Sequence, residues 1–209
     1  MSIDQRDHGA VNRAAQREQT RDRIVEAAVE VFASHGFDGA GTRAIAEVAG
    51  VTQGLLTYHF PSKDELWRAA ADRIFDLVAT EVVDQMRRLP ADVSRDTGRE
   101  YVRIYVRFVA RHPEVLHFMV DAQADPAGRC AWLVDSHLRR QYEDFGRTIT
   151  RFDPTIAERD VPHIFYSMVG AGSLVFGLSE EVRLLTDLDT RADSTIEAHA
   201  DIVARLILP

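Results

Sequence analysis

The sequence has one cysteine, one lysine and no long apolar run, and these shortages exclude several classes of protein. Cys130 is the only cysteine among 209 residues, so the chain cannot close an internal disulfide, and a reducing compartment suits it. No segment approaches the roughly 20 consecutive apolar residues that a membrane-spanning helix needs. The N-terminus, MSIDQRDHGAVNRAAQR, is polar and carries acidic residues, unlike a secretory signal. We therefore expect a cytoplasmic protein that does not enter membranes.

The sequence also lacks the common signatures of enzymes and metal sites. It contains no GxxxxGK[ST] phosphate loop, no GxSxG nucleophile turn, no HExxH pair and no GxGxxG dinucleotide motif. His117, Asp121 and Cys130 are close in the sequence but do not have a recognised catalytic spacing. The eight histidines are scattered and lack the spacing of metal ligands. We expect neither enzymatic activity nor a metal ion nor a cofactor.

Strand and hairpin signals are missing as well, whereas helical periodicity is frequent. From about Glu18, apolar residues recur at the spacing of one buried helix face, and Gly36 and Gly39 are expected to end this helix. The residues of that face are Ile24, Ala27, Ala28, Val31 and Phe32. The fold class is therefore all-α. Further helices are expected at about 42–49, 52–59, 63–88, 95–111, 113–124, 127–151, 158–176, 180–186 and 194–207.

Residues 42–59 have the features of two short helices joined by a tight turn. Thr42 is a suitable N-cap for the first helix. Gly50 follows that helix, and glycine tolerates the positive φ that a sharp turn requires. Thr52 can cap the second helix, and Leu56 can anchor its buried side. The other apolar residues expected to face the shared core are Ile45, Ala46, Ala49 and Val51. This order of features is typical of a helix-turn-helix.

The exposed face of the second helix carries groups that suit the major groove of DNA. The helix is roughly 12 Å long at 1.5 Å per residue. Gln53 carries an amide that can read an adenine, and Gly54 lets the backbone come close to the bases. Leu55 and Thr57 can touch a thymine methyl. Phosphate contacts are expected from Thr42, Arg43, Tyr58, His59 and Lys63.

The net charge of −8 argues at first against nucleic acid, because DNA-binding proteins usually carry a basic surface. The distribution of charge weakens this objection. Residues 1–68 hold 8 basic and 10 acidic side chains, whereas residues 69–209 hold 17 and 23. Between Thr42 and Lys63 there are two basic residues and one acid, Glu47. Charge alone leaves DNA binding undecided, so the motif has to decide it.

The stretch GTRAIAEVAGVTQGLLTYHFPSKDEL resembles the DNA-binding domain of the TetR (tetracycline repressor-like) family. The preceding TRDRIVEAAVEVFASHGFDG is similar to that family's first helix, and the resemblance covers about residues 18–68. It implies a three-helix DNA-binding domain on an all-helical ligand-binding and dimerisation domain. It also implies a repressor that usually leaves its operator when a ligand binds. The contacts it implies are Thr42, Arg43, Thr52, Gln53, Gly54, Tyr58, His59 and Lys63.

One position departs from the family pattern, because many members have an aromatic residue where this chain has Thr57.

The expected domain organisation has three parts. Residues 1–17, with Arg6, Arg13 and Arg17, are expected to form a flexible arm. Residues 18–62 form the helix-turn-helix domain, and residues 63–209 form the helical ligand-binding and dimerisation domain.

A homodimer is expected, because one short helix reads too few bases and two half-sites restore affinity and specificity. Small and apolar residues on helices 158–176 and 194–207 are the candidate interface, and the alternative is packing of the same residues within one chain. The candidates are Ile164, Phe165, Met168, Gly172, Val175, Ile196, His199, Val203 and Leu206. The expected partners are therefore a pseudo-palindromic operator, a second copy and a small-molecule effector.

The larger domain also holds candidates for an effector pocket, although each of them taken singly is better explained as plain core. They are Tyr101, Tyr105, Phe108, His117, Phe118, Trp132, Gln141, Phe145 and Tyr166.

Arginines at every fourth position from Arg95 to Arg111 wind around their helix by roughly 40° per step. We expect most of them to pair with surface acids, and one hypothesis points Arg103 or Arg107 inward toward an anionic ligand.

An alternative to a DNA-binding regulator stays open at this point. Short helices joined by glycine occur in many helical proteins, so a helical small-molecule-binding or interaction protein without DNA binding would also fit. The capped helices, the glycine turn and the candidate phosphate donors favour the regulator.

Overall fold

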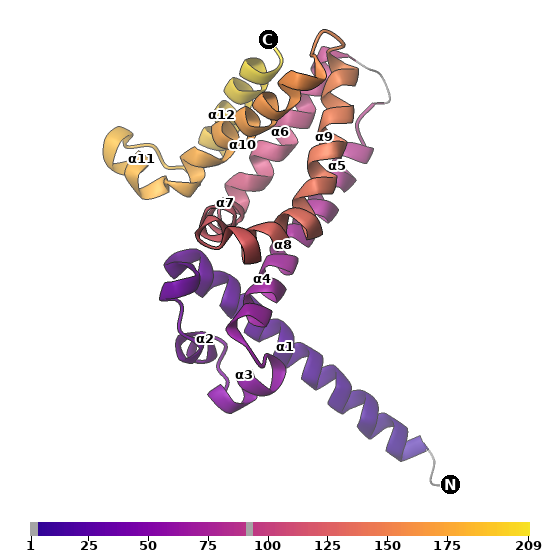
Figure 1. Ribbon diagram of the computed structural model, residues 1–209, viewed down its shortest axis with the longest axis vertical. Helices are drawn as coiled ribbons and strands as arrows, with labels where there is room; N and C mark the ends of the chain where they lie inside the picture. Colours follow the sequence, from indigo (N-terminus) through magenta and orange to yellow (C-terminus); the bar gives the residue numbers. More distant parts are fainter. Residues whose placement is uncertain (1–3, 91–93) are drawn as a thin grey trace. The chain divides into compact units, whose positions relative to one another are not determined.

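The computed structural model describes residues 4–90 and 94–209, and within these ranges the chain forms helices and turns without a strand (Figure 1). The all-α fold class is therefore confirmed. The chain divides into two compact units, Met1–Arg73 and Ile74–Pro209. Each unit is described here by itself.

The N-terminal unit contains α1 (Asp4–Gly39), α2 (Thr42–Val48), α3 (Gln53–His59) and the start of α4 (Lys63–Leu77). The apolar face expected on the first helix is buried, and α4 adds Leu66, Trp67 and Ala70 to the same core. Gly36 interrupts the helical geometry near the end of α1 with a φ of 67°. The Ser62 hydroxyl accepts a hydrogen bond from the Glu65 N–H at 3.1 Å, which caps the first turn of α4.

The first helix is longer than the apolar pattern predicts. The buried stripe begins at Ile24, and we expected the helix to begin at about Glu18, after a flexible arm. In the structure α1 begins at Asp4. The predicted arm residues Arg6 and Arg13 lie among those whose side chains are outside the described part of the structure. Residues 14–19 are exposed, so this part of α1 has no buried apolar stripe that a sequence pattern could detect.

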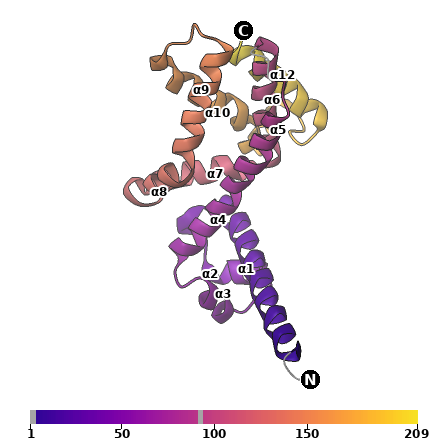
Figure 2. The same ribbon diagram turned by 90° about the vertical axis from the view of Figure 1, so that its right-hand side faces the viewer.

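The C-terminal unit is a bundle in which α6 (Arg95–Arg111) packs against α10 (Val161–Gly177) and α12 (Asp193–Ile207). Figures 1 and 2 show these helices side by side, with α9 (Arg139–Phe152) next to them. Helix α11 (Ser179–Thr186) extends away from this group in Figure 1. The side chains at the centre of the bundle are fully buried, among them Val102, Val106, Phe108, Phe118, Phe145, Ile149 and Val203.

Several helices expected to be continuous contain π-helical turns. The helix predicted at 63–88 consists of α4, the π-helical segment η1 (Val78–Val82) and α5 (Val83–Arg87). The helix predicted at 127–151 contains two more π segments. A π turn shifts the backbone register by one residue, and apolar spacing alone does not signal it. The elements of this region are α7 (Glu114–Asp121), η2 (Ala122–Ala124), η3 (Pro126–Cys130), α8 (Ala131–Leu133), η4 (Val134–Leu138) and, before α10, η5 (Glu158–Asp160).

Among the described residues, no single helix combines the length and the apolar composition of a membrane span. One pair, Glu158–Gly177 with Ser179–Thr186, meets both criteria only when taken together, and a bend of 72° separates its two parts.

Candidate nucleic-acid interface

Helices α2 and α3 form the predicted helix-turn-helix, and their inward side chains are buried. Ile45 is fully buried, and Ala46 and Ala49 retain 3% and 7% of their exposure. Leu56 anchors α3 on the same core with 2% exposure. The remaining faces of these helices are left at the surface of the unit.

The turn between the two helices depends on the backbone of Gly50, whose φ is 63°. The N–H of Gly50 donates to the Glu47 carbonyl at 3.1 Å, and the N–H of Val51 donates to the Ala46 carbonyl at 2.9 Å. A Cβ added to Gly50 would meet no atom within 4 Å. Glycine is therefore needed here for its positive φ and not for space.

The two helices begin in different ways. Thr52 is the N-cap of α3, as predicted, and its hydroxyl oxygen accepts from the Leu55 N–H at 3.2 Å. The prediction for Thr42 was wrong, because Gly41 is the N-cap of α2 and makes no side-chain capping bond. Thr42 is the first residue inside α2, so its hydroxyl is not in the capping position.

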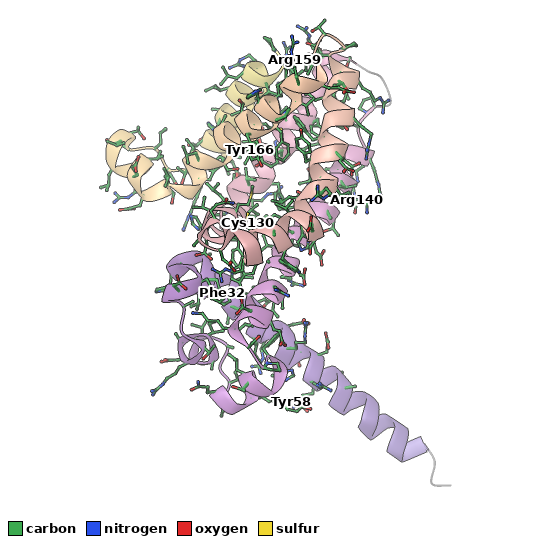
Figure 3. The ribbon with its side chains drawn as sticks, in the orientation of Figure 1. Phe32, Tyr58, Cys130, Arg140, Arg159 and Tyr166 are labelled. Atoms are coloured by element: carbon green, nitrogen blue, oxygen red, sulfur yellow. The ribbon has the colours of Figure 1, made fainter. Side chains whose placement is uncertain are left out.

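Helix α3 exposes the side chains that were predicted to read DNA. Gln53, Gly54 and Thr57 are exposed, and Leu55 and Tyr58 keep 39% and 64% of their exposure. The Thr57 hydroxyl donates to the Gln53 carbonyl at 3.0 Å. Tyr58 is labelled on the surface of α3 in Figure 3. Five of the predicted contacts therefore share the exposed side of one short helix, although their roles stay predictions.

Of the other predicted phosphate contacts, His59 is the last residue of α3, and the rest lie on α2 and α4. Arg43 is exposed on α2, and Thr42 and His59 are half-buried. The Lys63 ammonium lies 4.6 Å from the centroid of the Phe37 ring and donates to the Asp38 carbonyl at 3.5 Å. Lys63 is thus held against the end of α1.

Two arginines of α1 lie at the C-terminal end of α3, and the sequence analysis did not assign them a place there. The guanidinium carbon of Arg17 lies 5.3 Å from the centroid of the Tyr58 ring, and that of Arg21 lies 5.1 Å from the Phe60 ring. Burial lowers the pKa of His59, and the positive charges of Arg17 and Arg21 lower it further, while Glu18 opposes them. The i, i+4 spacing of Arg17 and Arg21 was the available signal, since it places both on one helix face.

The candidate pocket residues of the C-terminal unit lie in and around an aromatic core. The Tyr105 hydroxyl forms a hydrogen bond of 2.9 Å with the Ser173 hydroxyl, and burial raises the pKa of Tyr105 to about 12. Burial also raises the pKa of Tyr101, whose ring lies 6.4 Å from that of Phe145. Phe108, Phe118 and Phe145 are fully buried.

The other candidates lie farther from the centre of this core. His117 shares a hydrogen bond of 3.2 Å with the Gly177 carbonyl. Trp132 and Gln141 are half-buried. Tyr166 does not line the interior, because its side chain keeps 64% of its exposure and lies on the outside of α10.

Some of the residues assigned to a dimer interface lie inside the unit. Phe165, Met168, Gly172 and Val203 are buried within one chain. Phe165 packs against Tyr142 and Phe145 of α9, and Gly172 faces Tyr105 of α6. His199 is tied to the Ala171 carbonyl at 2.8 Å. Ile164, Val175 and Ile196 are half-buried, and Leu206 keeps 68% of its exposure. Other apolar side chains that point outward from α10 and α12 are Tyr166, Leu174 and Ile202.

The arginine row of α6 is paired with carboxylates and carbonyls, so the hypothesis of an inward Arg103 or Arg107 was wrong. Arg103 donates to Asp201 at 2.7 Å. Arg107 donates to Glu197 at 2.7 Å and to Glu100 at 2.6 Å. Since Glu197 and Asp201 belong to α12, these pairs join α6 to α12. Arg95, Arg99 and Arg111 bond to the Pro209, Leu208 and Arg107 carbonyls respectively.

No group of three or more histidine, cysteine, aspartate or glutamate side chains suited to a metal ion occurs in the described part of the chain. The conformation and the polar exposed face of α2 and α3 are the features that most resemble a binding site for a macromolecule.

Comparison with known sequences supports this assignment. The sequence profile for "Bacterial regulatory proteins, tetR family" matches residues 24–70. The regulatory protein RaaS of Mycobacterium tuberculosis is 55% identical over 60 residues, which are 29% of this chain and 26% of RaaS. The repressor NicS of Pseudomonas putida is 31% identical over 102 residues, 49% of this chain and 47% of NicS. The chain thus spans about a quarter to a half of the length of these curated relatives.

Solved structures resemble the chain over most of its length. A TetR-like transcriptional regulator from Rhodococcus sp. RHA1 is 25% identical with a TM-score of 0.63, over 91% of this chain and 93% of the other. AibR, solved with isovaleryl coenzyme A and operator DNA, shares the fold with a TM-score of 0.72 at 18% identity, over 91% of this chain and 98% of AibR. Residues 24–70, which contain the helix-turn-helix at 42–59, thus match the tetR family of bacterial regulatory proteins, and the chain as a whole shares the fold of a solved TetR-like regulator.

Proposed function

We propose that this protein is a sequence-specific DNA-binding transcriptional regulator that represses its target and is released by a small-molecule effector. One observation carries the proposal: α3 is anchored by Leu56 on one side and presents polar, exposed side chains on the other. Such a helix fits the major groove, where each base pair shows a distinct pattern of donors and acceptors. The regulators similar to this chain support the same function.

The roles of the individual contacts follow from their chemistry. Gln53 suits an adenine edge, and Leu55 suits a thymine methyl. Tyr58 and Arg43 are exposed and suit backbone phosphates, which fix the position of the protein but carry no sequence information. The Thr57 hydroxyl already donates within α3, so its methyl group is the better candidate for contact with a base.

The regulator acts as a homodimer in this proposal, through the outward faces of α10 and α12. These two helices contact each other and leave large apolar side chains exposed, which is typical of surfaces that a partner covers. The proposed interface residues are Tyr166, Leu174, Ile202 and Leu206, with Ile164, Val175 and Ile196 at the edges. The buried candidates Phe165, Met168, Gly172 and Val203 support this surface from inside.

The effector is expected to bind in the C-terminal unit among its aromatic side chains. The Tyr105–Ser173 pair is a polar group in otherwise apolar surroundings, an arrangement that fixes the orientation of small molecules. AibR was solved with isovaleryl coenzyme A, and a fatty acid degradation regulator from Bacillus halodurans has the same fold with a TM-score of 0.67 at 18% identity. Acyl thioesters and fatty acids are therefore the first compounds to test.

We place the regulator in the cytoplasm, and we assign it no enzymatic activity.

Fluorescence anisotropy on short duplexes that tile the intergenic DNA next to the gene tests this function. We expect tight, selective binding of two subunits to one pseudo-palindromic duplex, with affinity that falls steeply as salt rises. Adding an acyl-CoA series to the bound complex then tests the release. Sequence-indifferent binding to every tile and to random duplexes would contradict a sequence-specific regulator.

The double substitution Tyr58→Ala with Lys63→Ala separates this function from that of a helical interaction protein. It is expected to abolish operator binding, because it removes two proposed phosphate contacts from each subunit. Circular dichroism and sedimentation should show an unchanged fold and an unchanged dimer, since Tyr58 is largely exposed and the hydrogen bond of the Lys63 ammonium to the Asp38 carbonyl is long at 3.5 Å. An effector that still binds the double variant would confirm that the second unit is intact.

A further inference from the structure

Helix α1 lies beside the C-terminal end of α3, although the helix-turn-helix pattern does not include α1. The Arg17 guanidinium lies over the Tyr58 ring, and the Arg21 guanidinium lies over the Phe60 ring. Phe60 is 5% exposed, so the contact of Arg21 holds α1 against the unit. Arg17 is one helical turn nearer the N-terminus and is exposed, as is the Tyr58 ring beneath it. A cation over an aromatic face is attracted to it, so each ring fixes the position of its arginine.

A phosphate that binds at this end of α3 needs a positive charge that α3 does not supply. The C-terminal end of a helix carries a partial negative charge, which repels anions. The Tyr58 hydroxyl offers a phosphate one donated hydrogen bond and no positive charge. Burial and the two arginines lower the pKa of His59, which favours the uncharged ring. The last turn of α3 therefore offers donors without a full charge.

Lys63 does not fill this need in the structure, whereas Arg17 does. The Lys63 ammonium lies against the Phe37 ring and the Asp38 carbonyl. Arg17 lies directly over Tyr58 and close enough to His59 for its charge to act on the imidazole. Arg17 is thus the exposed cation placed beside the hydroxyl that is expected to contact DNA.

We propose that Arg17 contacts DNA directly, binding through its guanidinium the same backbone phosphate as the Tyr58 hydroxyl, so that α1 is part of the DNA interface. This inference rests on the proposed function. A guanidinium suits the role, because its planar set of N–H donors can bind phosphate oxygens in pairs while its face stacks on an aromatic ring. Stacking on Tyr58 also limits the freedom that the side chain would lose on binding.

The test compares Arg17→Ala with a matched control, Arg23→Ala. Arg23 is also an exposed arginine of α1. It follows Arg17 by six positions and therefore points about 120° away from it around the helix. Both variants lose one charge per subunit. Affinity is measured by anisotropy from low to high salt on the operator and on a random duplex, and circular dichroism checks the fold of each variant. Arg17→Lys keeps the charge without the planar donors.

We expect Arg17→Ala to weaken binding at least about tenfold and to reduce the slope of log affinity against log salt by about 1.8 per dimer, roughly 0.9 for each lost phosphate contact. The loss should be equal on the operator and on the random duplex, because phosphates carry no sequence information. Arg17→Lys should retain most of the slope, and Arg23→Ala should retain both slope and affinity.

Two results would overturn the assignment of Arg17. If Arg17→Ala behaves like Arg23→Ala, the guanidinium does not contact DNA. If affinity falls while the salt slope stays unchanged, Arg17 only positions Tyr58. Failure of the proposed function would look different. A protein that binds all duplexes equally is not a sequence-specific regulator, yet Arg17→Ala would still weaken its binding to the random duplex. Absence of any binding by the unmodified protein would overturn both.

Discussion

Gly50 and Gly54 are only four positions apart, yet they are glycines for different physical reasons. Neither has an atom within 4 Å of an added Cβ, so a methyl group fits at both. Gly50 has a φ of 63°, and an alanine in this left-handed region costs about 1–2 kcal/mol. We expect Gly50→Ala to lower the free energy of unfolding by about that amount, as measured by urea titration. Unchanged stability would mean that the turn can adopt another conformation.

Gly54→Ala is expected to have the opposite effect on stability and a separate effect on function. Gly54 lies inside α3, where alanine is favoured over glycine by up to about 1 kcal/mol. The variant should therefore unfold at higher urea concentration than the natural protein. It should also bind the operator less tightly, because the new methyl group lies on the face that we place in the groove. A variant that is more stable and binds equally well would remove Gly54 from the proposed interface.

Residues whose roles depend on their immediate neighbours were predicted correctly. Thr52 caps the helix that follows it, and Gly50 makes the turn, because both roles are set within four residues. The cap of α2 was predicted one position too late, at Thr42, since Gly41 also tolerates the extended backbone of an N-cap. Arg17 was assigned to a flexible arm because its contact, Tyr58, is 41 positions away and no local rule connects them.

At the scale of helices, the row of arginines shows where sequence reasoning ends. The spacing predicted that the row winds around α6, and the surplus of acids predicted pairing. The sequence could not show that Arg103 and Arg107 form ion pairs with Asp201 and Glu197 of α12, because those carboxylates are 98 and 90 positions away. The same holds for the π-helical turns, which depend on the packing of the second unit.

The pairs between α6 and α12 should make the second unit sensitive to acid. Hydrogen bonding to Arg107 lowers the pKa of Glu197 below 4.5, and hydrogen bonding to Arg103 lowers that of Asp201 below 3.8. At pH values near these pKa values the unfolded chain therefore binds more protons than the folded chain. The contribution of the two pairs to the free energy of unfolding is complete above the ordinary pKa values of the carboxyls, and it is lost as pH falls through their lowered pKa values. Thermal unfolding measured from pH 7 to pH 3 should show the melting temperature decreasing below about pH 5.

Arg107→Gln should make this acid dependence smaller, because Glu197 then keeps a pKa near its ordinary value. Arg111→Gln is the matched control, since the Arg111 guanidinium donates to the Arg107 carbonyl at 3.1 Å. The effect at neutral pH should be modest, because exposed ion pairs contribute little to stability. Equal acid dependence in the two variants would show that other carboxylates cause the loss of stability.

Close packing between α6 and α10 gives a further prediction at this scale. A Cβ on Gly172 would lie 2.9 Å from Cε1 of Tyr105, and a buried ring has little room to move. Gly172→Ala should therefore destabilise the protein by about 1–3 kcal/mol and disturb the Tyr105–Ser173 hydrogen bond. Gly170→Ala is the control, because Gly170 lies on the same helix with no atom within 4 Å of an added Cβ. Thermal unfolding of the two variants measures the difference.

For the molecule as a whole, the proposed dimer links the two units in function, because each α3 reads only one half-site. Leu206 keeps 68% of its exposure on α12, so a glutamate there fits one chain without strain but would place a charge inside the proposed interface. We expect Leu206→Glu to shift the protein toward monomers in sedimentation and to weaken operator binding by at least tenfold, since a monomer loses the second half-site. Leu184→Glu on α11, at 69% exposure, is the matched control and should remain dimeric. If Leu206→Glu stays dimeric while Leu184→Glu dissociates, the interface is formed around α11, and the outward faces of α10 and α12 have another role.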